Sequence, residues 1–315
     1  MRILIAAIFI LVLVAFPFIV SSSYLIDLAV VIFLYSALAL SWDIIARTGL
    51  LSLAHHAFFG IGAYTSVLIC INYGLDPILS MILGGVVASL AAAGIGAITL
   101  KLRGLYFAIA TLAFAGFMQV VVLQLPELTG GAGGITLQNP LFGGNLIQSY
   151  LLAFLIFLAT LGVAIYLSKS KYKYSMAVIA SNEIVAKTFG INVPRTILKV
   201  FMISSFFPGF IGAYYVHYIA YVNPHIGFDT AITLAVLAMT IFGGMGTNFG
   251  PVIGAAILKI AEEILRISFA YGHMIVYGII LIVVILFFPK GLMGIFSERE
   301  SLIFSKIEAI KKLMK

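Results

Sequence analysis

The stretch ILSMILGGVVASLAAAGIGAITL, residues 78–100, contains no charged side chain. A helix of this length is about 35 Å long, enough to cross the roughly 30 Å hydrocarbon core of a bilayer. The whole chain has the same character, because 63% of its 315 residues are hydrophobic and only 9% are charged. A soluble domain has about 25% charged residues, so this composition excludes a water-facing fold. The sequence therefore predicts an all-α, polytopic integral membrane protein.

Charges and clusters of Pro, Gly or Asn divide the chain into about ten predicted transmembrane helices. They cover residues 3–20, 25–42, 50–71, 78–100, 104–125, 149–167, 200–222, 230–247, 251–268 and 274–288. Glycines interrupt the runs at 50–71 and 230–268, so some of these helices are predicted to be broken or re-entrant. Residues 1–296 form the predicted transmembrane domain, and 297–315 form a basic amphipathic tail in the cytoplasm.

The lysines and arginines predict the orientation of the chain. With ten spans, nearly all of them fall on one side of the membrane, and the exceptions are Lys259 and Arg266. Cytoplasmic loops are enriched in these residues, so both termini are predicted to be cytoplasmic. The net charge of +7 then reflects membrane orientation and not nucleic-acid binding. The first apolar run could also be a signal peptide, but no A-x-A cleavage site follows it and a retained helix is preferred.

The inner loop 168–199 is the one sizeable cytoplasmic loop, and it carries signals for a short helix. Asn182 is a typical N-cap, Glu183 and Lys187 have the favourable i, i+4 order, and Gly190 is a typical stop. We interpret the loop as a docking surface for a cytoplasmic partner. The alternative is a solvated linker helix on the lipid headgroups. The candidate coupling residues are Asn182, Glu183, Ile184, Lys187, Phe189 and Gly190.

Histidines and glycines within the apolar runs are candidates for a translocation path. An ionisable side chain such as His55 or His56 is costly in a membrane and indicates a polar path, although hydrogen bonds to neighbouring helices explain it equally well. Glycine-interrupted runs in both halves of the chain favour a path between two repeats, or else close helix packing. The candidate path residues are Ser52, His55, His56, Gly60, Gly62, Tyr64, Gly243, Gly244 and Gly246.

Missing motifs exclude several chemical functions. The chain has one cysteine, Cys70, and neither CxxC nor HExxH, so no metal or redox site is expected. It also lacks the GxxxxGK[ST] phosphate loop, so ATP is not expected to bind to this chain. We expect no bound cofactor and no enzymatic activity. Lys259, Glu262 and Glu263 have helical spacing and are expected to neutralise one another.

Several motifs together resemble a known family. The stretch GLLSLAHHAFFGIGAY, residues 49–64, is similar to the signature of branched-chain amino acid ABC transporter permeases of the LivH/LivM family. The motifs that follow in the same order are RGLYFAIATL at 103–112, TGGAGGI at 129–135, EI and GIN within 183–192, GGMGTNFGP at 243–251 and FPKGL at 288–292. The long connection between the first motif and the inner loop favours the LivM type.

This resemblance implies a permease subunit in the cell membrane of a prokaryote. Two permeases, one of LivH type, would pair with two ATP-binding subunits, and an extracytoplasmic binding protein would deliver leucine, isoleucine or valine. Residues 1–296 would then be the permease domain, with 168–199 as its coupling loop. The alternatives are a stand-alone ion-coupled secondary transporter and an importer for urea or short amides.

Overall fold

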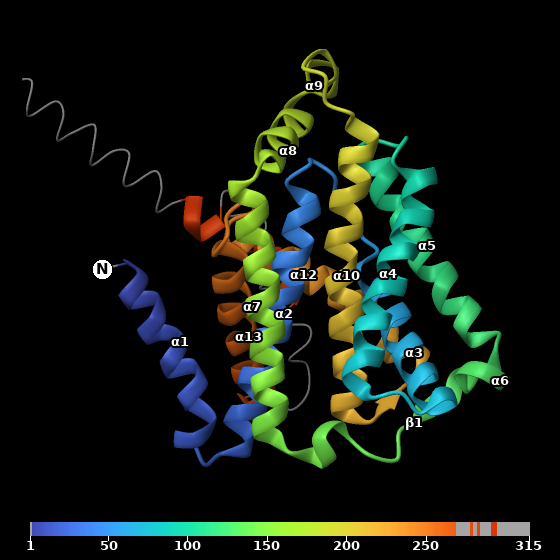
Figure 1. The fold of residues 1–315 in the computed structure, drawn as a ribbon, viewed down its shortest axis with the longest axis vertical. Helices are drawn as coiled ribbons and strands as arrows, with labels where there is room; N and C mark the ends of the chain where they lie inside the picture. Colours follow the sequence, from blue (N-terminus) through green and yellow to red (C-terminus); the bar gives the residue numbers. More distant parts are fainter. Residues whose placement is uncertain (1, 269–277, 280–281, 284–290, 295–315) are drawn as a thin grey trace, which may run out of the picture.

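The computed structural model describes residues 2–268, 278–279, 282–283 and 291–294. Long helices dominate it and run roughly side by side (Figure 1). Seven helices in this part of the chain are long and apolar enough to cross a membrane. The prediction of an all-α polytopic membrane protein is confirmed. Most of the predicted span 274–288 and all of the tail 297–315 lie outside the described residues.

The helices correspond to the predicted spans, with differences of up to seven residues at the helix starts. Those of membrane length are α2 (Ser23–Ala46), α3 (His55–Tyr73), α4 (Pro77–Thr99), α5 (Leu105–Leu123), α7 (Leu146–Lys169), α10 (Val193–Ile219) and the segment Pro224–Gly243, which contains α11 (Pro224–Gly227) and α12 (Thr230–Gly243). Helices α1 (Arg2–Ile19) and α13 (Gly250–Ser268) coincide with the predicted spans 3–20 and 251–268. The predicted spans 230–247 and 251–268 correspond to the separate helices α12 and α13, and the glycine-containing residues 244–249 lie between them.

Helix α3 begins five residues later than its predicted span, which started at residue 50. The backbone just before it is held by side chains instead of by a helix. The Trp42 indole donates a hydrogen bond to the Ser52 carbonyl (2.8 Å), and the Leu53 amide donates to the Thr111 hydroxyl (3.0 Å). These bonds satisfy buried backbone groups, so the segment can run through the protein interior without being helical.

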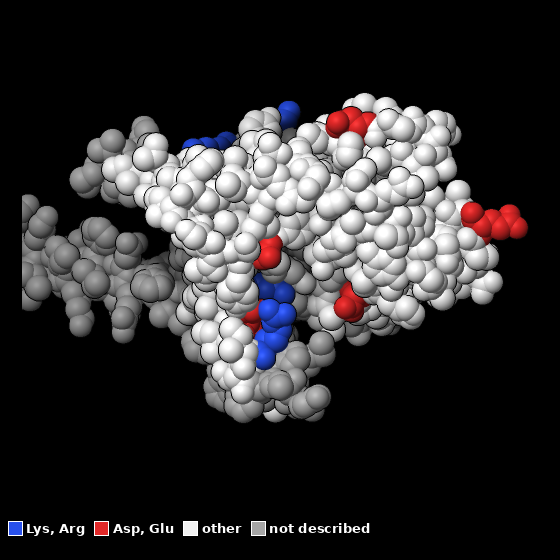
Figure 2. Space-filling view, turned by 90° about the horizontal axis from the view of Figure 1, so that it is seen from below, with Lys and Arg blue, Asp and Glu red and all other residues white. Residues whose placement is uncertain are grey.

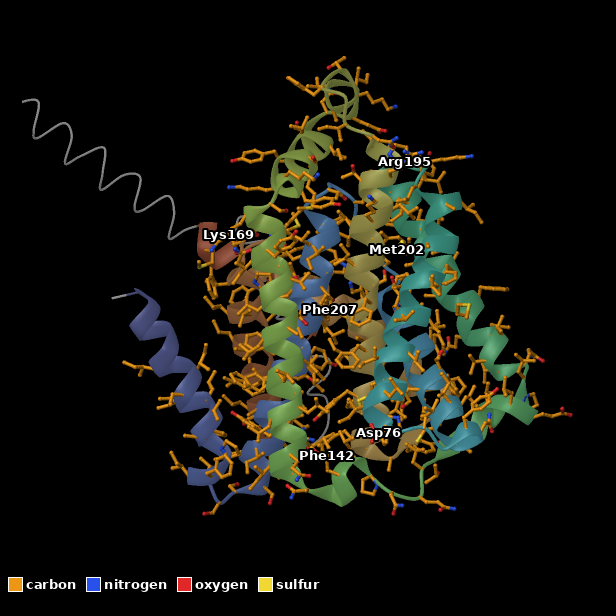
Figure 3. All side chains as sticks on the ribbon, in the orientation of Figure 1. Asp76, Phe142, Lys169, Arg195, Met202 and Phe207 are labelled. Carbon is orange, nitrogen blue, oxygen red and sulfur yellow. The ribbon has the colours of Figure 1, made fainter. Side chains whose placement is uncertain are left out.

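The two ends of the helix bundle differ. At one end, α8 (Lys171–Ser181) and α9 (Glu183–Thr188) project beyond the other helices (Figure 1). We call this the α8–α9 end. At the opposite end, β1 (Ile135–Thr136) pairs antiparallel with β2 (Tyr221–Val222), near the short helices α6 (Pro126–Thr129), η1 (Gly131–Gly133) and η2 (Leu141–Gly144). We call this the β1–β2 end. Figure 3 shows Lys169 and Arg195 toward the first end and Asp76 and Phe142 toward the second.

Side-chain caps explain where several helices begin. Asp76 accepts a hydrogen bond from the Ile78 amide at the start of α4, and Asp229 accepts one from the Ala231 amide at the start of α12. Asn192 caps α10 in the same way, so this helix starts within the predicted inner loop 168–199. Such caps satisfy amides that have no partner within the helix. The connection between α7 and α10 is therefore occupied mainly by α8 and α9.

Candidate functional site

The α9 helix has the cap and the stop that the sequence predicts. The Asn182 side-chain oxygen accepts hydrogen bonds from the amides of Ile184 (2.9 Å) and Val185 (3.3 Å). Gly190 has a φ of +75°, a conformation that favours glycine, and its amide bonds to the Lys187 carbonyl (3.0 Å). A short helix with both ends fixed is a rigid element at the tip of the molecule.

Two of the candidate coupling residues are apolar and face outward from this tip. Ile184 is 74% exposed and Phe189 is 75% exposed. The buried Ala186 faces the other way and anchors α9 to the rest of the chain. Large exposed apolar side chains on a rigid polar scaffold are typical of a protein interaction surface.

Glu183 connects α9 to a distant part of the chain. Its carboxylate forms an ion pair with Arg103, which lies just before α5, and a longer one with Lys187 (3.5 Å). The i, i+4 spacing predicts the contact with Lys187, but no local pattern predicts the one with Arg103, which is 80 positions away along the chain. The only signal for Arg103 was its place at the start of the 103–112 motif.

A buried polar cluster joins α2, α7 and the loop between α12 and α13. The Arg47 guanidinium lies 2.7 Å from the Asp43 carboxylate, 2.6 Å from the Ser168 hydroxyl and 3.1 Å from the Asn248 side-chain oxygen. The other Asp43 oxygen accepts a hydrogen bond from the Gly246 amide (2.6 Å). The Asp43 side chain is fully buried. From the sequence, Arg47 was expected only to be one of the cytoplasmic cations.

The second glycine motif shapes this loop. Gly244 and Gly246 have φ values of +119° and +81°, which L side chains rarely adopt. A Cβ atom on Gly243 would lie 1.8 Å from the Gly250 carbonyl oxygen, so this glycine allows α12 and α13 to touch. Gly246 also borders a cavity of 480 Å³ beside Arg47. These candidate path residues therefore have structural roles.

The two adjacent histidines have different surroundings. His56 Nδ1 lies 2.9 Å from the Thr233 hydroxyl oxygen, and this oxygen also accepts a hydrogen bond from the His56 amide (2.9 Å). His56 thus joins α3 to α12. His55 is fully buried, and neither of its ring nitrogens has a hydrogen-bond partner among the described residues.

Of the remaining candidate path residues, Ser52 is buried in the non-helical segment before α3, and Gly60, Gly62 and Tyr64 lie at helix contacts. A Cβ atom on Gly62 would lie 2.0 Å from the Gly209 carbonyl oxygen of α10, and one on Gly60 would lie 2.7 Å from the Gly227 carbonyl oxygen. Tyr64 is buried and stacks on the Phe228 ring; the two centroids are 6.2 Å apart, within the range of about 4.5–7 Å for aromatic pairs. Small residues that bring backbones together are the usual means of packing membrane helices.

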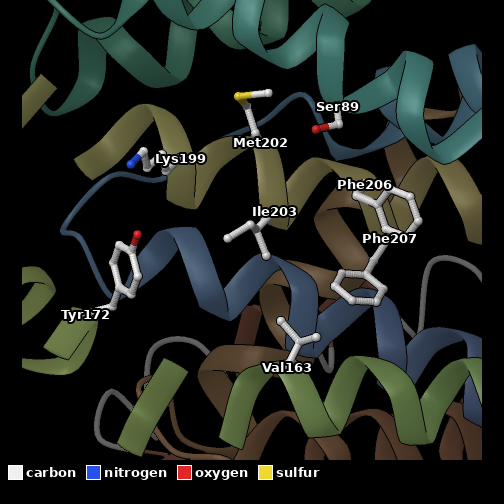
Figure 4. A pocket seen from close by; sticks show the side chains of 8 residues that line it. All are labelled: Ser89, Val163, Tyr172, Lys199, Met202, Ile203, Phe206 and Phe207. Atoms are coloured by element: carbon white, nitrogen blue, oxygen red, sulfur yellow. The ribbon is translucent and has the colours of Figure 1, made fainter. Parts of the chain in front are cut away.

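A cavity of 530 Å³ has a mostly apolar lining (Figure 4). Its walls come from α4, α7 and α10, and they include Met202, Ile203 and Phe207. Lys199 and the Tyr172 hydroxyl are its main polar groups and lie at one end of it (Figure 4). A smaller cavity of 300 Å³ is lined by polar as well as apolar side chains from α2, α3, α10, α12 and α13.

The described part of the chain contains no candidate metal-binding site. No group of three or more His, Cys, Asp or Glu side chains there could hold a metal ion. The candidate sites are instead a rigid exposed tip, a buried polar cluster and cavities among apolar helices. A fold of this kind, with these features, defines a multi-pass membrane protein.

Comparison with known proteins identifies the family. Residues 24–285 match the family described as "Branched-chain amino acid transport system / permease component", and the chain belongs to that family. It is 30% identical over 309 residues to the LivM permease proteins of the high-affinity branched-chain amino acid transport systems of Salmonella typhimurium and Escherichia coli. Each match covers 89% of this chain and 72% of the relative.

The LivH permease protein of Escherichia coli is also similar, with 25% identity over 288 residues. That match covers 82% of this chain and 91% of LivH. No solved structure matches the chain. The resemblance that the motifs indicated is confirmed, and the LivM type is the more similar of the two.

Proposed function

We propose that this chain is the membrane-spanning subunit of an ATP-driven importer for leucine, isoleucine and valine. The family and the named relatives support the transport role and the substrate class. The chain lacks a phosphate loop, so ATP would be bound and hydrolysed by partner subunits, and this subunit would not itself be an enzyme. The single observation that carries the coupling mechanism is the rigid α9 tip with its exposed apolar residues.

The proposed assembly contains two permeases, one of LivH type, two ATP-binding subunits and an extracytoplasmic binding protein. The ATP-binding subunits would dock on Ile184 and Phe189 at the α8–α9 end. Movement of α9 would reach the helix bundle through the Glu183–Arg103 ion pair and the start of α5. The same end holds the Arg47 cluster, which joins three parts of the bundle into one unit.

The proposed topology has ten spans, with both termini and the α8–α9 end in the cytoplasm of a prokaryotic cell. The lysines and arginines near this end, among them Lys169 and Arg195 (Figure 3), support it. The test is labelling of single cysteines in a Cys70→Ser chain. Thr188→Cys should react only with reagent on the cytoplasmic side, and Gln138→Cys only with reagent outside. Reaction of both from one side would overturn this topology.

The function itself is tested by purification and reconstitution. We expect this chain to copurify with a second permease and an ATP-binding subunit, and leucine uptake by vesicles to require ATP and all subunits. Uptake by this chain alone, driven by an ion gradient, would contradict the proposal and support a secondary transporter. ATP-driven uptake of urea or a short amide, with no uptake of leucine, would contradict the substrate class.

A further inference from the structure

The 300 Å³ cavity combines an apolar wall with groups of opposite charge. Seven Val, Leu, Ile and Phe side chains form most of its surface, and the polar lining consists of Tyr35, Tyr215, Asp229 and Lys259. Its volume lies at the lower end of the range of about 300–1,000 Å³ for small-molecule sites. Such sites usually have a few polar groups that fix the orientation of the ligand. The cavity thus has the size and lining of a site for a small ligand with an apolar part.

Lys259 is the cationic group of this cavity, and it is almost buried. Its side chain is 10% exposed, and its ammonium lies 2.9 Å from a Glu262 carboxylate oxygen and 3.7 Å from the centroid of the Tyr35 ring. A charge in a membrane protein is costly and usually indicates a functional site. From their helical spacing, Lys259 and its acidic neighbours were expected only to neutralise one another.

Lys259 also borders a second cavity, of 290 Å³, which contains Glu262, Glu263 and Arg266. Val31 and Lys259 line both cavities, so the two are adjacent. Seen from the β1–β2 end, charged side chains of both signs gather in a hollow (Figure 2). In the proposed topology this end faces outward, so a solute would meet the charged hollow first and Lys259 next.

Two hydroxyls in the inner cavity are available to a ligand. Tyr35 and Tyr215 line it, and neither hydroxyl makes a hydrogen bond with any described residue. Asp229 uses one oxygen to cap α12. Its carboxylate and the Lys259 ammonium therefore provide an anion and a cation at the same cavity. Lys259 is almost buried and paired with Glu262, whereas Asp229 is exposed, so a ligand with both charges would bind the remaining Lys259 N–H donors and the free Asp229 oxygen.

We propose that this cavity is a binding site for the zwitterion of an aliphatic amino acid within the permease. The substrate carboxylate would bind Lys259 and a tyrosine hydroxyl, the substrate ammonium would bind Asp229, and the side chain would contact the apolar wall. A molecule with a single charge would make only one of these two charged contacts. This inference rests on the proposed function, because it assumes that amino acids cross this subunit.

The test measures ligand protection in the reconstituted importer and uses a cysteine in the cavity wall. In a Cys70→Ser chain with Ile232→Cys, leucine should slow thiol labelling at least fivefold. Isoamylamine, which lacks the carboxylate, and 4-methylpentanoate, which lacks the ammonium, should not protect at the same concentration. Equal protection by either analogue would overturn the proposal.

Variants then test the polar groups. Tyr215→Phe should raise the half-protecting leucine concentration about tenfold, because a hydrogen bond to a charged group is lost. Tyr214→Phe is the matched control: this neighbouring hydroxyl is bonded to the Ser149 carbonyl (2.7 Å) and does not line the cavity. The pair Lys259→Met with Glu262→Gln should abolish protection without leaving an unpaired carboxylate. Unchanged protection in both Tyr215→Phe and the Lys259 pair would contradict the site.

The two proposals fail in different ways. ATP-driven leucine uptake by the wild type without any protection of Ile232→Cys would reject the cavity site and leave the importer intact. An absence of leucine uptake with all subunits present would reject the proposed function. Protection by leucine together with uptake, both weakened by Tyr215→Phe but not by Tyr214→Phe, is the result expected.

Discussion

The α9 tip and the glycine-rich helix α3 both contain candidate site residues predicted from the sequence, but these residues have different surroundings. At the tip, the Ile184 and Phe189 side chains are exposed and accessible to a partner protein. In α3, Gly60 packs against the backbone of α11, and Gly62 packs against the backbone of α10. The comparison shows that Gly60 and Gly62 lie at close helix contacts, whereas Ile184 and Phe189 are exposed on a capped helix.

The largest effect is expected where a glycine separates two backbones. Gly62→Leu should prevent assembly of the helix bundle, because even a Cβ atom would lie 2.0 Å from the Gly209 carbonyl oxygen. Gly94→Leu on α4 is the matched control, since a Cβ there meets no atom within 4 Å. The measurement is the yield of monodisperse protein in detergent. A normal yield of the Gly62 variant would show that α3 and α10 do not pack closely.

A large loss of stability is expected at the buried Arg47 cluster. Arg47→Met leaves the Asp43 carboxylate buried without its cation, which typically costs about 3–5 kcal/mol. The double variant Asp43→Asn with Arg47→Met should recover part of that loss, because no uncompensated charge remains. Thermal unfolding of the purified proteins measures the stability of the single and the double variant. Equal stability of the single variant and the wild type would show that the cluster does not hold α2, α7 and the α12–α13 loop together.

A selective loss of coupling is expected at Glu183. Glu183→Lys breaks the ion pair with Arg103, adds a like charge at i+4 from Lys187 and places a cation at a helix N-terminus. Uptake and substrate-stimulated ATP hydrolysis should fall together, by about tenfold, while membrane insertion is unchanged. Glu127→Lys, in α6 at the other end, is the control. Full coupling in the Glu183→Lys variant would show that α9 does not couple ATP hydrolysis to transport.

The smallest effect is expected at the contact between α3 and α12. Thr233→Val removes the hydroxyl that bonds to His56, and the loss should be about 1 kcal/mol. His56→Ala with Thr233→Val should cost less than the sum of the two single changes, because the partners interact directly. Unfolding of the wild type, the two single variants and the double variant measures the interaction energy between His56 and Thr233. A strong fall in uptake by His56→Ala, with normal stability, would instead favour histidine as a path residue.

The sequence predicted the features that depend on neighbouring residues. Long apolar runs predicted the membrane helices, and the Asn182 cap and the Gly190 stop predicted α9. Both kinds of signal depend only on residues that are close in the sequence. It did not predict the Glu183–Arg103 pair or the Arg47 cluster. Apart from the Asp43–Arg47 pair, which is four positions apart, those contacts join residues 80 or more positions apart, and only the packing of the helices brings them together.

The same limit applies to the candidate path. Glycines that open a channel and glycines that close a helix contact look alike in a sequence, and only the distances across α3 and α10 distinguish them. The cavity beside Lys259 was missed because its polar groups come from four separate helices or their caps. An ionisable residue inside an apolar span was the one available signal.

The central claim is that an ATP-binding subunit docks on the α9 tip. The most direct measurement places a photoreactive phenylalanine analogue at Phe189 in the assembled importer, and at Phe142 near the β1–β2 end as the control (Figure 3). The proposed function predicts a cross-link to the ATP-binding subunit from position 189 and none from position 142. An intact, active complex that gives no such cross-link at 189, or gives it at 142, would contradict the claim.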